Sequence, residues 1–379
     1  MEKRKFKDTE VSLLGFGTMR MPTIEPESTK IDEPKAEAML EYAMDNGVNY
    51  IDTAYMYHDG EAEPFLGKAL KKYKRENFLL ATKMPMWYGK NIGDIEKIFD
   101  EQLKKLDTDY FDFYLCHNLN VNFFSITQKL KVYEFLAKKK EEGYIKHLGF
   151  SFHDTPELLE KIIKAYSWDF GQIQLNYIDW EFQEAKKQYE LLEQNGLACI
   201  VMEPVRGGVL ANLTPESKKI LNYYAPNKST ASWAMRYAAQ LPNVLTVLSG
   251  MSSMAQLEDN LKTINNFQPL SPKEDEVLKA AIKEFLSHET VPCTGCAYCT
   301  KCSQKVNIPK LLQLLNNRLL GGSDFTLLQD YSVMKSSEKE SNCTECQNCV
   351  DICPQHIDIP QELQRLSDLI KQAYINENQ

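Results

Sequence analysis

The sequence predicts an α/β protein, a (β/α)8 TIM barrel followed by a small cysteine-rich domain. From Leu13 to about residue 266, short apolar runs alternate with longer amphipathic helical patterns. Eight such units in about 250 residues match the size of a (β/α)8 barrel. Eight of the ten cysteines follow near the C-terminus. A doubly wound sheet fits less well, because the G-x-G-x-x-G fingerprint of that architecture is absent.

Each predicted strand is a short apolar run, and each predicted helix shows a helical spacing of apolar residues. The strands are expected at residues 13–17, 48–51, 78–82, 111–115, 147–150, 172–175, 198–202 and 245–248. Helical patterns include residues 34–46, 93–106, 156–166, 182–194 and 254–266. Gly47, Gly143 and Gly196 come just after helical patterns, where a left-handed C-cap favours glycine.

The chain is expected to contain three parts. Residues 1–266 form the barrel, residues 267–291 form a helical linker, and residues 292–379 form the cysteine-rich domain. Pro269 and Pro272 interrupt the preceding helix, and a helical pattern then covers residues 273–288. Within the last part, helices are predicted at 308–318 and 361–374, and residues 321–341 are expected to be loosely structured.

Charge and hydropathy exclude two classes of partner. The 44 basic and 53 acidic residues give a net charge of −9, which does not favour nucleic acid or an anionic membrane surface. No apolar stretch is long enough to span a bilayer. The charged first residues do not resemble a signal peptide, so we expect a cytoplasmic protein, a compartment where thiols stay reduced.

The cysteines near the C-terminus form two runs with short, regular spacing. The second run reads C-x2-C-x2-C-x3-C-P, which is typical of a cubane iron–sulfur cluster. Zinc more often takes C-x2-C pairs from two separate hairpins, and a reducing compartment disfavours disulfides. We therefore predict a ferredoxin-like domain with two [4Fe-4S] clusters, held by Cys293, Cys296, Cys299, Cys302, Cys343, Cys346, Cys349 and Cys353.

The assignment of these ligands follows a rule for two-cluster ferredoxins. The fourth cysteine of each run ligates the other run's cluster, so Cys302 would join the second cluster and Cys353 the first. The first run departs from the pattern, since its last gap is two residues and Ser303 stands where proline is usual. This departure leaves the cross-ligation open.

Polar residues stand at or just after the ends of three consecutive predicted strands. Asp52 ends the second strand, Lys83 the third and His117 the fourth, and Tyr57 lies in the loop after Asp52. In a barrel, catalytic residues project from the C-terminal ends of the strands. A structural ion pair beside a core histidine is the alternative interpretation of the same residues.

The segment around Asp52 resembles a known signature. Residues 47–57, which read GVNYIDTAYMY, together with Gly60, Glu63 and Leu66-Gly67, resemble the aldo-keto reductase superfamily. With the cysteine runs, the chain is similar to the ferredoxin-fused subgroup of these reductases. The resemblance implies Tyr57 as proton donor, Lys83 as its modulator paired with Asp52, and His117 as the orienting residue. A nearby ammonium makes the Tyr57 phenol a stronger acid, which suits these roles.

The resemblance also implies residues that bind NADPH or NADH. Ser151 and Gln172, which opens the sixth predicted strand, fall where the family holds the nicotinamide carboxamide. Met202 stands where many members place an aromatic residue, and Gln256 where an arginine commonly grips the 2′-phosphate. The loop after strand eight, leading into a helix, suits phosphate. The remaining expected cofactor residues are Thr18, Met19, Arg206, Ser249, Gly250, Ser252 and Asn260.

Three functions remain open at this point. The first is reversible NAD(P)H-dependent reduction of an aldehyde or ketone, with a small carbonyl or alcohol as substrate and clusters that are structural or transfer electrons. The second is a ferredoxin-linked enzyme with FMN, because flavin can exchange both one and two electrons, and ferredoxin or another small redox protein would be its partner. The third is a redox sensor that binds nicotinamide without turnover.

Overall fold

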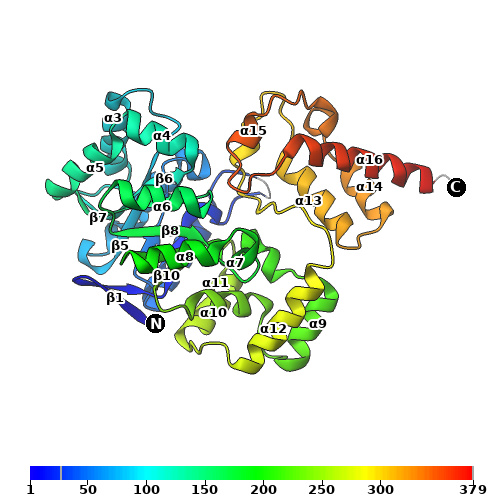
Figure 1. Cartoon of the computed structure of the whole chain (residues 1–379), viewed down its shortest axis with the longest axis horizontal. Helices are drawn as coiled ribbons and strands as arrows, with labels where there is room; N and C mark the ends of the chain where they lie inside the picture. The colour runs from blue at the N-terminus through cyan, green and yellow to red at the C-terminus, as the bar shows by residue number, and fades with distance from the viewer. Residues whose placement is uncertain (26–27, 378–379) are drawn as a thin grey trace. The chain divides into compact units, whose positions relative to one another are not determined.

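We describe a computed structural model of the chain that covers residues 1–25 and 28–377. Its internal contacts divide the chain into two compact units, and Figure 1 shows the course of the chain coloured by residue number. The first unit comprises Met1–Val205 and Ala231–Lys273. The second comprises Arg206–Thr230 and the described chain from Glu274 onward. Within the described residues, no helix is both long and apolar enough to cross a bilayer.

Among the described residues of the first unit, eight parallel strands close into a barrel. Their order is β10-β3-β4-β5-β6-β7-β8-β9, so strands that follow one another in the sequence are neighbours in the barrel. The last strand pairs with the first through Val247 and Leu14. The (β/α)8 prediction and the eight predicted strand positions are therefore confirmed. The strands are β3 (Leu14–Gly17), β4 (Tyr50–Asp52), β5 (Leu79–Pro85), β6 (Phe111–Leu119), β7 (Ile145–Phe152), β8 (Phe170–Gln174), β9 (Ala198–Met202) and β10 (Val244–Gly250).

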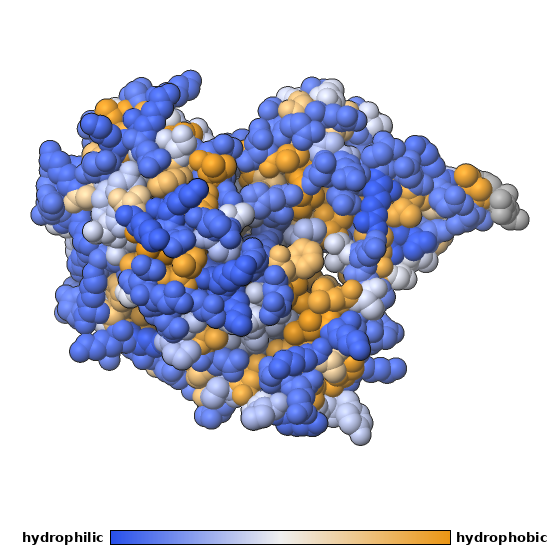
Figure 2. Space-filling view, in the orientation of Figure 1, coloured by the Kyte–Doolittle hydropathy of each residue, from blue (hydrophilic) through white to orange (hydrophobic). Residues whose placement is uncertain are grey.

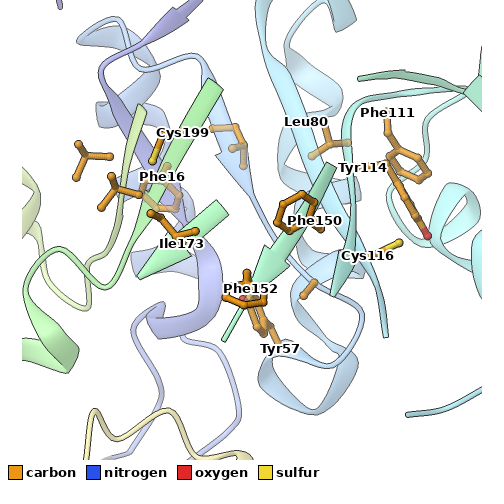
Figure 3. Packing of buried hydrophobic residues seen from close by; sticks show 14 of the residues in the cluster. Phe16, Tyr57, Leu80, Phe111, Tyr114, Cys116, Phe150, Phe152, Ile173 and Cys199 are labelled. Atoms are coloured by element: carbon orange, nitrogen blue, oxygen red, sulfur yellow. The ribbon is translucent and has the colours of Figure 1, made fainter. Parts of the chain in front are cut away.

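Amphipathic helices surround these strands and bury their apolar faces against them. Figure 3 shows part of this layer, to which Phe16, Leu80 and Phe150 contribute from the strands. The side chains that face solvent over the helices are mostly hydrophilic (Figure 2). The helices are α1 (Glu33–Asp45), α2 (Ala62–Ala69), α3 (Ile92–Lys105), α4 (Val121–Lys129), α5 (Val132–Glu141), α6 (Pro156–Ala165), α7 (Asp179–Phe182), α8 (Ala185–Gln194), α10 (Thr230–Ala239) and α11 (Met254–Asn265).

A short N-terminal hairpin packs against the N-terminal ends of the barrel strands. It consists of β1 (Lys3–Phe6) and β2 (Thr9–Ser12), which pair antiparallel. The Phe6 ring lies 5.7 Å from the ring of Phe113 and 4.9 Å from that of His147. Phe6, Phe113 and the neighbouring interior side chains Tyr50, Phe170 and Ile200 form one apolar cluster. The sequence did not predict this hairpin, because its strands are short and largely polar.

The stability of this packing is expected to fall as the pH falls from about 6.5 to about 4. Burial lowers the pKa of His147 from 6.5 to about 4. Between these values the unfolded chain binds a proton that the folded chain excludes, so stability is fully present above pH 6.5 and is lost toward pH 4. Urea unfolding of the wild type should show this slope. The slope should be smaller in His147→Leu and unchanged in the control His288→Gln, and an equal slope in His147→Leu would contradict the prediction.

Within the described residues, the regular structure of the second unit is helical. Its helices are α9 (Pro215–Tyr224), α12 (Pro272–Phe285), α13 (Ile308–Leu319), α14 (Asp324–Ser332), α15 (Asn348–Asp351) and α16 (Ile359–Glu377). Leu315, Leu328 and Leu366 join one core across α13, α14 and α16. Ser217 of α9 donates a hydrogen bond to the Ala281 carbonyl of α12 at 3.0 Å, which ties segment Arg206–Thr230 to this unit.

Two sequence expectations need correction. Residues 321–341 are not uniformly loose, because α14 forms there. The Ser323 hydroxyl accepts a hydrogen bond from Thr326 N at 3.1 Å and caps the helix, and Leu327, Leu328 and Tyr331 bury one of its faces. Gln172 does not open its strand but lies in the middle of β8, where it pairs with Ser151 and Ile200. The domain boundaries at residues 266 and 291 stay a prediction.

Candidate functional site

A buried ion pair lies at the C-terminal ends of two neighbouring barrel strands. The Lys83 ammonium donates to Asp52 Oδ1 at 2.7 Å and to the Thr53 carbonyl at 2.7 Å. Lys83 is fully buried and Asp52 is nearly so. Burial lowers the pKa of Lys83, and the Asp52 carboxylate opposes this shift. Burial likewise raises the pKa of Asp52, and Lys83 opposes it. Each charge therefore depends on the other, and losing one would leave a costly unpaired charge.

Tyr57 stands beside this pair. It begins the short helical turn η2 (Tyr57–Gly60), and its side chain is buried. Lys83 Nζ lies 5.1 Å from the centre of the Tyr57 ring, within the range of an attractive cation–ring contact. An ammonium at this distance favours the phenolate over the phenol, which is the condition for a phenol that gives up its proton.

His117 borders Tyr57 on another side. The two ring centres are 6.2 Å apart, and the rings meet edge to face. Burial, followed by the charges of Lys83 and His153, holds the pKa of His117 well below its usual value. His117 is therefore neutral near pH 7, with one ring N–H to donate. Trp87 lies 5.1 Å from the His117 ring and 5.4 Å from Phe123, which gives this side an aromatic wall.

A buried polar network connects the back of β5 to two helices. The Glu63 carboxylate of α2 accepts from Thr82 at 2.7 Å and from Gln102 of α3 at 2.6 Å. Gln102 also donates to the Lys83 carbonyl at 3.2 Å. The strand that carries Lys83 is thereby fixed to the helix that follows Tyr57. Sequence reasoning placed Glu63 in the signature but missed this network, because Gln102 carries no separate motif.

The residues expected to hold nicotinamide lie on β7, β8 and β9. Ser151 and Gln172 are neighbours across the β7–β8 pair, and both are buried. Gln172 Nε2 donates to the Met202 sulfur at 3.4 Å. Gln172 Oε1 is buried and has no hydrogen-bond partner within the described part of the chain. A buried amide oxygen without a partner is costly, so this position suits a ligand that carries an N–H group, as a carboxamide does.

The polar side chains at the end of β10 and in the loop after it form hydrogen bonds with one another and with neighbouring backbone. The Ser249 hydroxyl accepts from Asn260 at 3.0 Å. Gln256 Oε1 accepts from the Ser252 N–H at 2.8 Å, and the Ser252 hydroxyl donates to the Arg20 carbonyl at 2.8 Å. The Gln256 side chain therefore already accepts one of the backbone N–H groups at the N-terminus of α11. Arg20, which forms an ion pair with Glu203 at 3.1 Å, brings a positive charge to this loop.

Three further expected cofactor residues have different surroundings. Thr18 donates a hydrogen bond to the Asp52 carbonyl at 3.0 Å, and Met19 packs against the main apolar cluster. Gly250 allows close approach, because a Cβ atom there would lie 3.2 Å from Arg20 Cβ. Arg206 belongs to the second unit, so its expected role stays a prediction.

Electrostatic neighbours associate the eight C-terminal cysteines in two groups of four. Burial raises the pKa of Cys299, and Cys296, Cys293 and Cys353 raise it further. Burial, with smaller contributions from Cys343, Cys346 and Cys302, raises the pKa of Cys349 to about 11. Cys302, Cys343, Cys346 and Cys349 also line one cavity, which Cys299 borders as well. Each group thus contains three cysteines of one run and the fourth of the other, as the cross-ligation rule requires.

The two cysteine runs have matching backbones. Left-handed residues recur between the first and second cysteines (Gly295 and Glu345), between the second and third (Ala297 and Gln347), and three residues after the fourth (Lys305 and His356). Gly295 N and Glu345 N also donate to Cys293 and Cys343 at 3.4 and 3.5 Å. Two loops with the same conformation and the same N–H···S contacts suit two equivalent clusters.

The unequal last gap of the two runs has a structural explanation. The two-residue gap after Cys299 begins within a 3-10 turn, η6 (Tyr298–Thr300), and the three-residue gap after Cys349 begins within a turn of α-helix, α15. Since a 3-10 helix has 3.0 residues per turn and an α-helix 3.6, the wider turn accommodates one more residue. Within the described residues, no three side chains converge as they would around one metal ion, and a cubane does not require this because each thiolate binds a different corner.

Comparison with protein families agrees with this geometry. A model of the aldo/keto reductase family matches residues 13–283, which is most of the chain. The chain belongs to the aldo/keto reductase family. A model of the 4Fe-4S dicluster domain matches residues 292–357 of this reductase-family chain. The resemblance to the ferredoxin-fused subgroup and the iron–sulfur domain are thereby confirmed.

Individual relatives match the barrel part of this family member. An uncharacterized oxidoreductase of Bacillus subtilis, YqkF, is 25% identical over 316 residues, covering 75% of this chain and 97% of the relative. The holo structure of aldo-keto reductase AKR11C1 from Bacillus halodurans is 27% identical with a TM-score of 0.61, covering 74% of this chain and 96% of that one. An aldo-keto reductase of Klebsiella pneumoniae in complex with NADPH shares the fold, with 22% identity, a TM-score of 0.59, and coverage of 75% and 96%.

Proposed function

We propose that the barrel catalyses the reversible reduction of an aldehyde or ketone to an alcohol with NADPH or NADH. The observation that supports this proposal is the buried Lys83–Asp52 pair, whose ammonium lies 5.1 Å from the Tyr57 ring. The reduced nicotinamide would supply a hydride to the carbonyl carbon. Tyr57 would supply the proton to the carbonyl oxygen, so that the two transfers together form the alcohol.

Each residue of this group has a distinct task in that reaction. Lys83 stabilises the phenolate that Tyr57 becomes after it gives up its proton, and Asp52 keeps Lys83 charged and oriented. Neutral His117 donates its N–H to the carbonyl oxygen, where negative charge develops. Trp87 and Phe123 contribute an apolar wall on the His117 side, which favours a substrate with an apolar or aromatic group next to the carbonyl.

For the cofactor, the donor and acceptor groups of β7 and β8 fit a carboxamide. Gln172 Oε1 would accept its N–H, and the Ser151 hydroxyl, which accepts from Asn118 N at 2.8 Å, still has its own proton to donate. Arg20, which follows β3 and whose carbonyl accepts from the Ser252 hydroxyl, would supply charge on the phosphate side. Gln256 is engaged with Ser252 and has no charge, so the structure provides no arginine there for a 2′-phosphate.

In the second unit, we propose two [4Fe-4S] clusters, one held by Cys293, Cys296, Cys299 and Cys353, and one by Cys302, Cys343, Cys346 and Cys349. The two groups of thiols described above support this assignment. Crossed ligands keep two clusters close, which suits one-electron transfer to a partner such as ferredoxin. Because nicotinamide passes two electrons together, a relay from the barrel would need an adaptor such as FMN.

A visible spectrum of anaerobically purified protein, recorded before and after NADPH or NADH and then with simple aldehydes, tests these alternatives. We expect a broad visible absorption band from the clusters that nicotinamide leaves unchanged, and aldehyde-dependent oxidation of the nicotinamide. A flavin envelope, or bleaching of the cluster band by nicotinamide, would instead favour the ferredoxin-linked enzyme. Binding without turnover of any aldehyde would favour a sensor.

A further inference from the structure

The residue after Tyr57 has an unusual environment. His58 and Asp59 both adopt left-handed backbone angles, with φ of 53° and 56°, and Gly60 follows with φ of 93°. The loop that carries Tyr57 is therefore strained and needs external contacts to hold it. His58 supplies two of them. Its Nδ1 lies 3.0 Å from the Thr29 carbonyl oxygen, and its Nε2 lies 3.1 Å from the Thr18 carbonyl oxygen.

Both partners of the His58 ring are acceptors. A carbonyl oxygen has no proton to give, and a neutral imidazole has only one N–H. Neutral His58 forms one of the two hydrogen bonds at a time, and a second proton would place a positive charge in a partly buried site. We propose that His58 is a positioning residue, a clamp that holds the Tyr57 loop through its neutral ring and loosens when the ring binds a second proton. Its effect on catalysis rests on the function proposed above.

The two carbonyls belong to segments that border the site. Thr18 follows β3 and donates its hydroxyl to the Asp52 carbonyl at 3.0 Å, so one arm of the clamp reaches the residue that orients Lys83. Thr29 belongs to a loop whose base is closed by a hydrogen bond from Asp32 N to the Pro22 carbonyl at 2.8 Å. The contact between His58 and the Thr29 carbonyl therefore joins the Tyr57 loop to the segment that contains Thr29.

The charges around His58 determine where the clamp responds. Burial lowers the pKa of His58 below 6.5, and the Thr29 and Thr18 carbonyls and the Asp59 carboxylate oppose this shift. Charged groups on the neighbouring segments are mostly paired with one another: Arg20 with Glu203 at 3.1 Å, and Asp32 with Lys35 at 2.7 Å. Glu25 and Lys30 flank Thr29 in sequence. The clamp therefore holds above pH 6.5 and loosens as the pH falls below that value.

Hydrogen exchange of the full, cluster-loaded chain between pH 5.5 and 8, corrected for intrinsic rates, tests the clamp without reference to activity. Amides of the Tyr57 loop and of the described residues around Thr29 should exchange several-fold faster on the acidic side, because the ring binds its second proton more tightly when the loop is open. His58→Asn, which tolerates the left-handed backbone, should abolish this difference. Asp59→Asn should move it to lower pH, and the control His288→Gln should retain it.

The pH profile of kcat then tests the positioning role. The wild type should show an inflection below pH 6.5 that is absent in His58→Asn and shifted in Asp59→Asn. Exchange that does not depend on pH, or that is the same in His58→Asn as in the wild type, would overturn the clamp. An unaltered kcat profile in His58→Asn would overturn its positioning role. If no substrate is turned over, the proposed function fails, and the exchange result still decides the clamp.

Discussion

Replacing Tyr57 with phenylalanine should reduce turnover by roughly 100- to 10,000-fold, the usual contribution of a positioned acid. The variant keeps the ring that packs near Lys83 and His117 and loses only the hydroxyl group. Nicotinamide contacts are expected on Ser151 and Gln172 instead, so the affinity for NADPH or NADH should remain within about twofold of the wild-type value, as for a loss confined to the transition state. Steady-state kinetics and nicotinamide fluorescence titration measure the two quantities.

Tyr55→Phe is the matched control for that variant. Tyr55 stands two residues before Tyr57, and its hydroxyl donates to Glu101 at 2.8 Å, away from Lys83. The Tyr55→Phe variant should keep near wild-type turnover. If Tyr57→Phe also kept near wild-type turnover, Tyr57 would not be the acid, and the proposed mechanism would be wrong.

Replacing Cys302 with serine should remove one of the two clusters and leave the other. Iron content should fall from about eight to about four atoms per chain if each group of four thiolates holds one cubane. The reason is that Cys302 joins Cys343 and Cys346 as an electrostatic neighbour of Cys349, although it belongs to the other run. Iron analysis and electron paramagnetic resonance of the reduced protein measure the loss.

The identity of the remaining cluster tests the crossed ligands. Cys302→Ser and Cys343→Ser should leave the same resonance signal, and Cys353→Ser and Cys293→Ser should leave the other. Ser303→Ala, next to Cys302 in the same cavity, should retain both clusters. A Cys302→Ser signal that matched the one from Cys293→Ser would show that each run holds its own cluster.

The sequence alone predicted the barrel because a parallel strand buried on both faces must be apolar along its length. The strand runs at 78–82 and 111–115 are examples, although β5 and β6 extend to Pro85 and Leu119. Asp52, Lys83 and His117 were predicted as a group for a related reason. A charge at the end of such a run has no local explanation, and a barrel brings all strand ends to one side. The spacing of the cysteines in the sequence was likewise sufficient to predict an iron–sulfur domain.

Other features depended on contacts between distant residues. The N-terminal hairpin is stabilised by Phe6 against Phe113 and His147, and its own short strands carry little signal. Segment Arg206–Thr230 interrupts the barrel sequence yet packs in the second unit. At Gly207, a Cβ atom would lie 1.9 Å from the Thr294 carbonyl oxygen, between two cysteines of the first run, so this close approach requires glycine. A local pattern cannot reveal such a contact.

The finer chemistry of the site was also decided by tertiary structure. Sequence placed Gln256 near a phosphate group, but its hydrogen bond to Ser252 follows from the cap of α11. His58 looked like a loop residue, and only the fold places the Thr18 and Thr29 carbonyls on either side of its ring. Residue types and their spacing determined which groups can react. Burial and distance arise from long-range packing. They determined which of these groups are charged, which are paired, and which have a hydrogen-bonding atom that a ligand could satisfy.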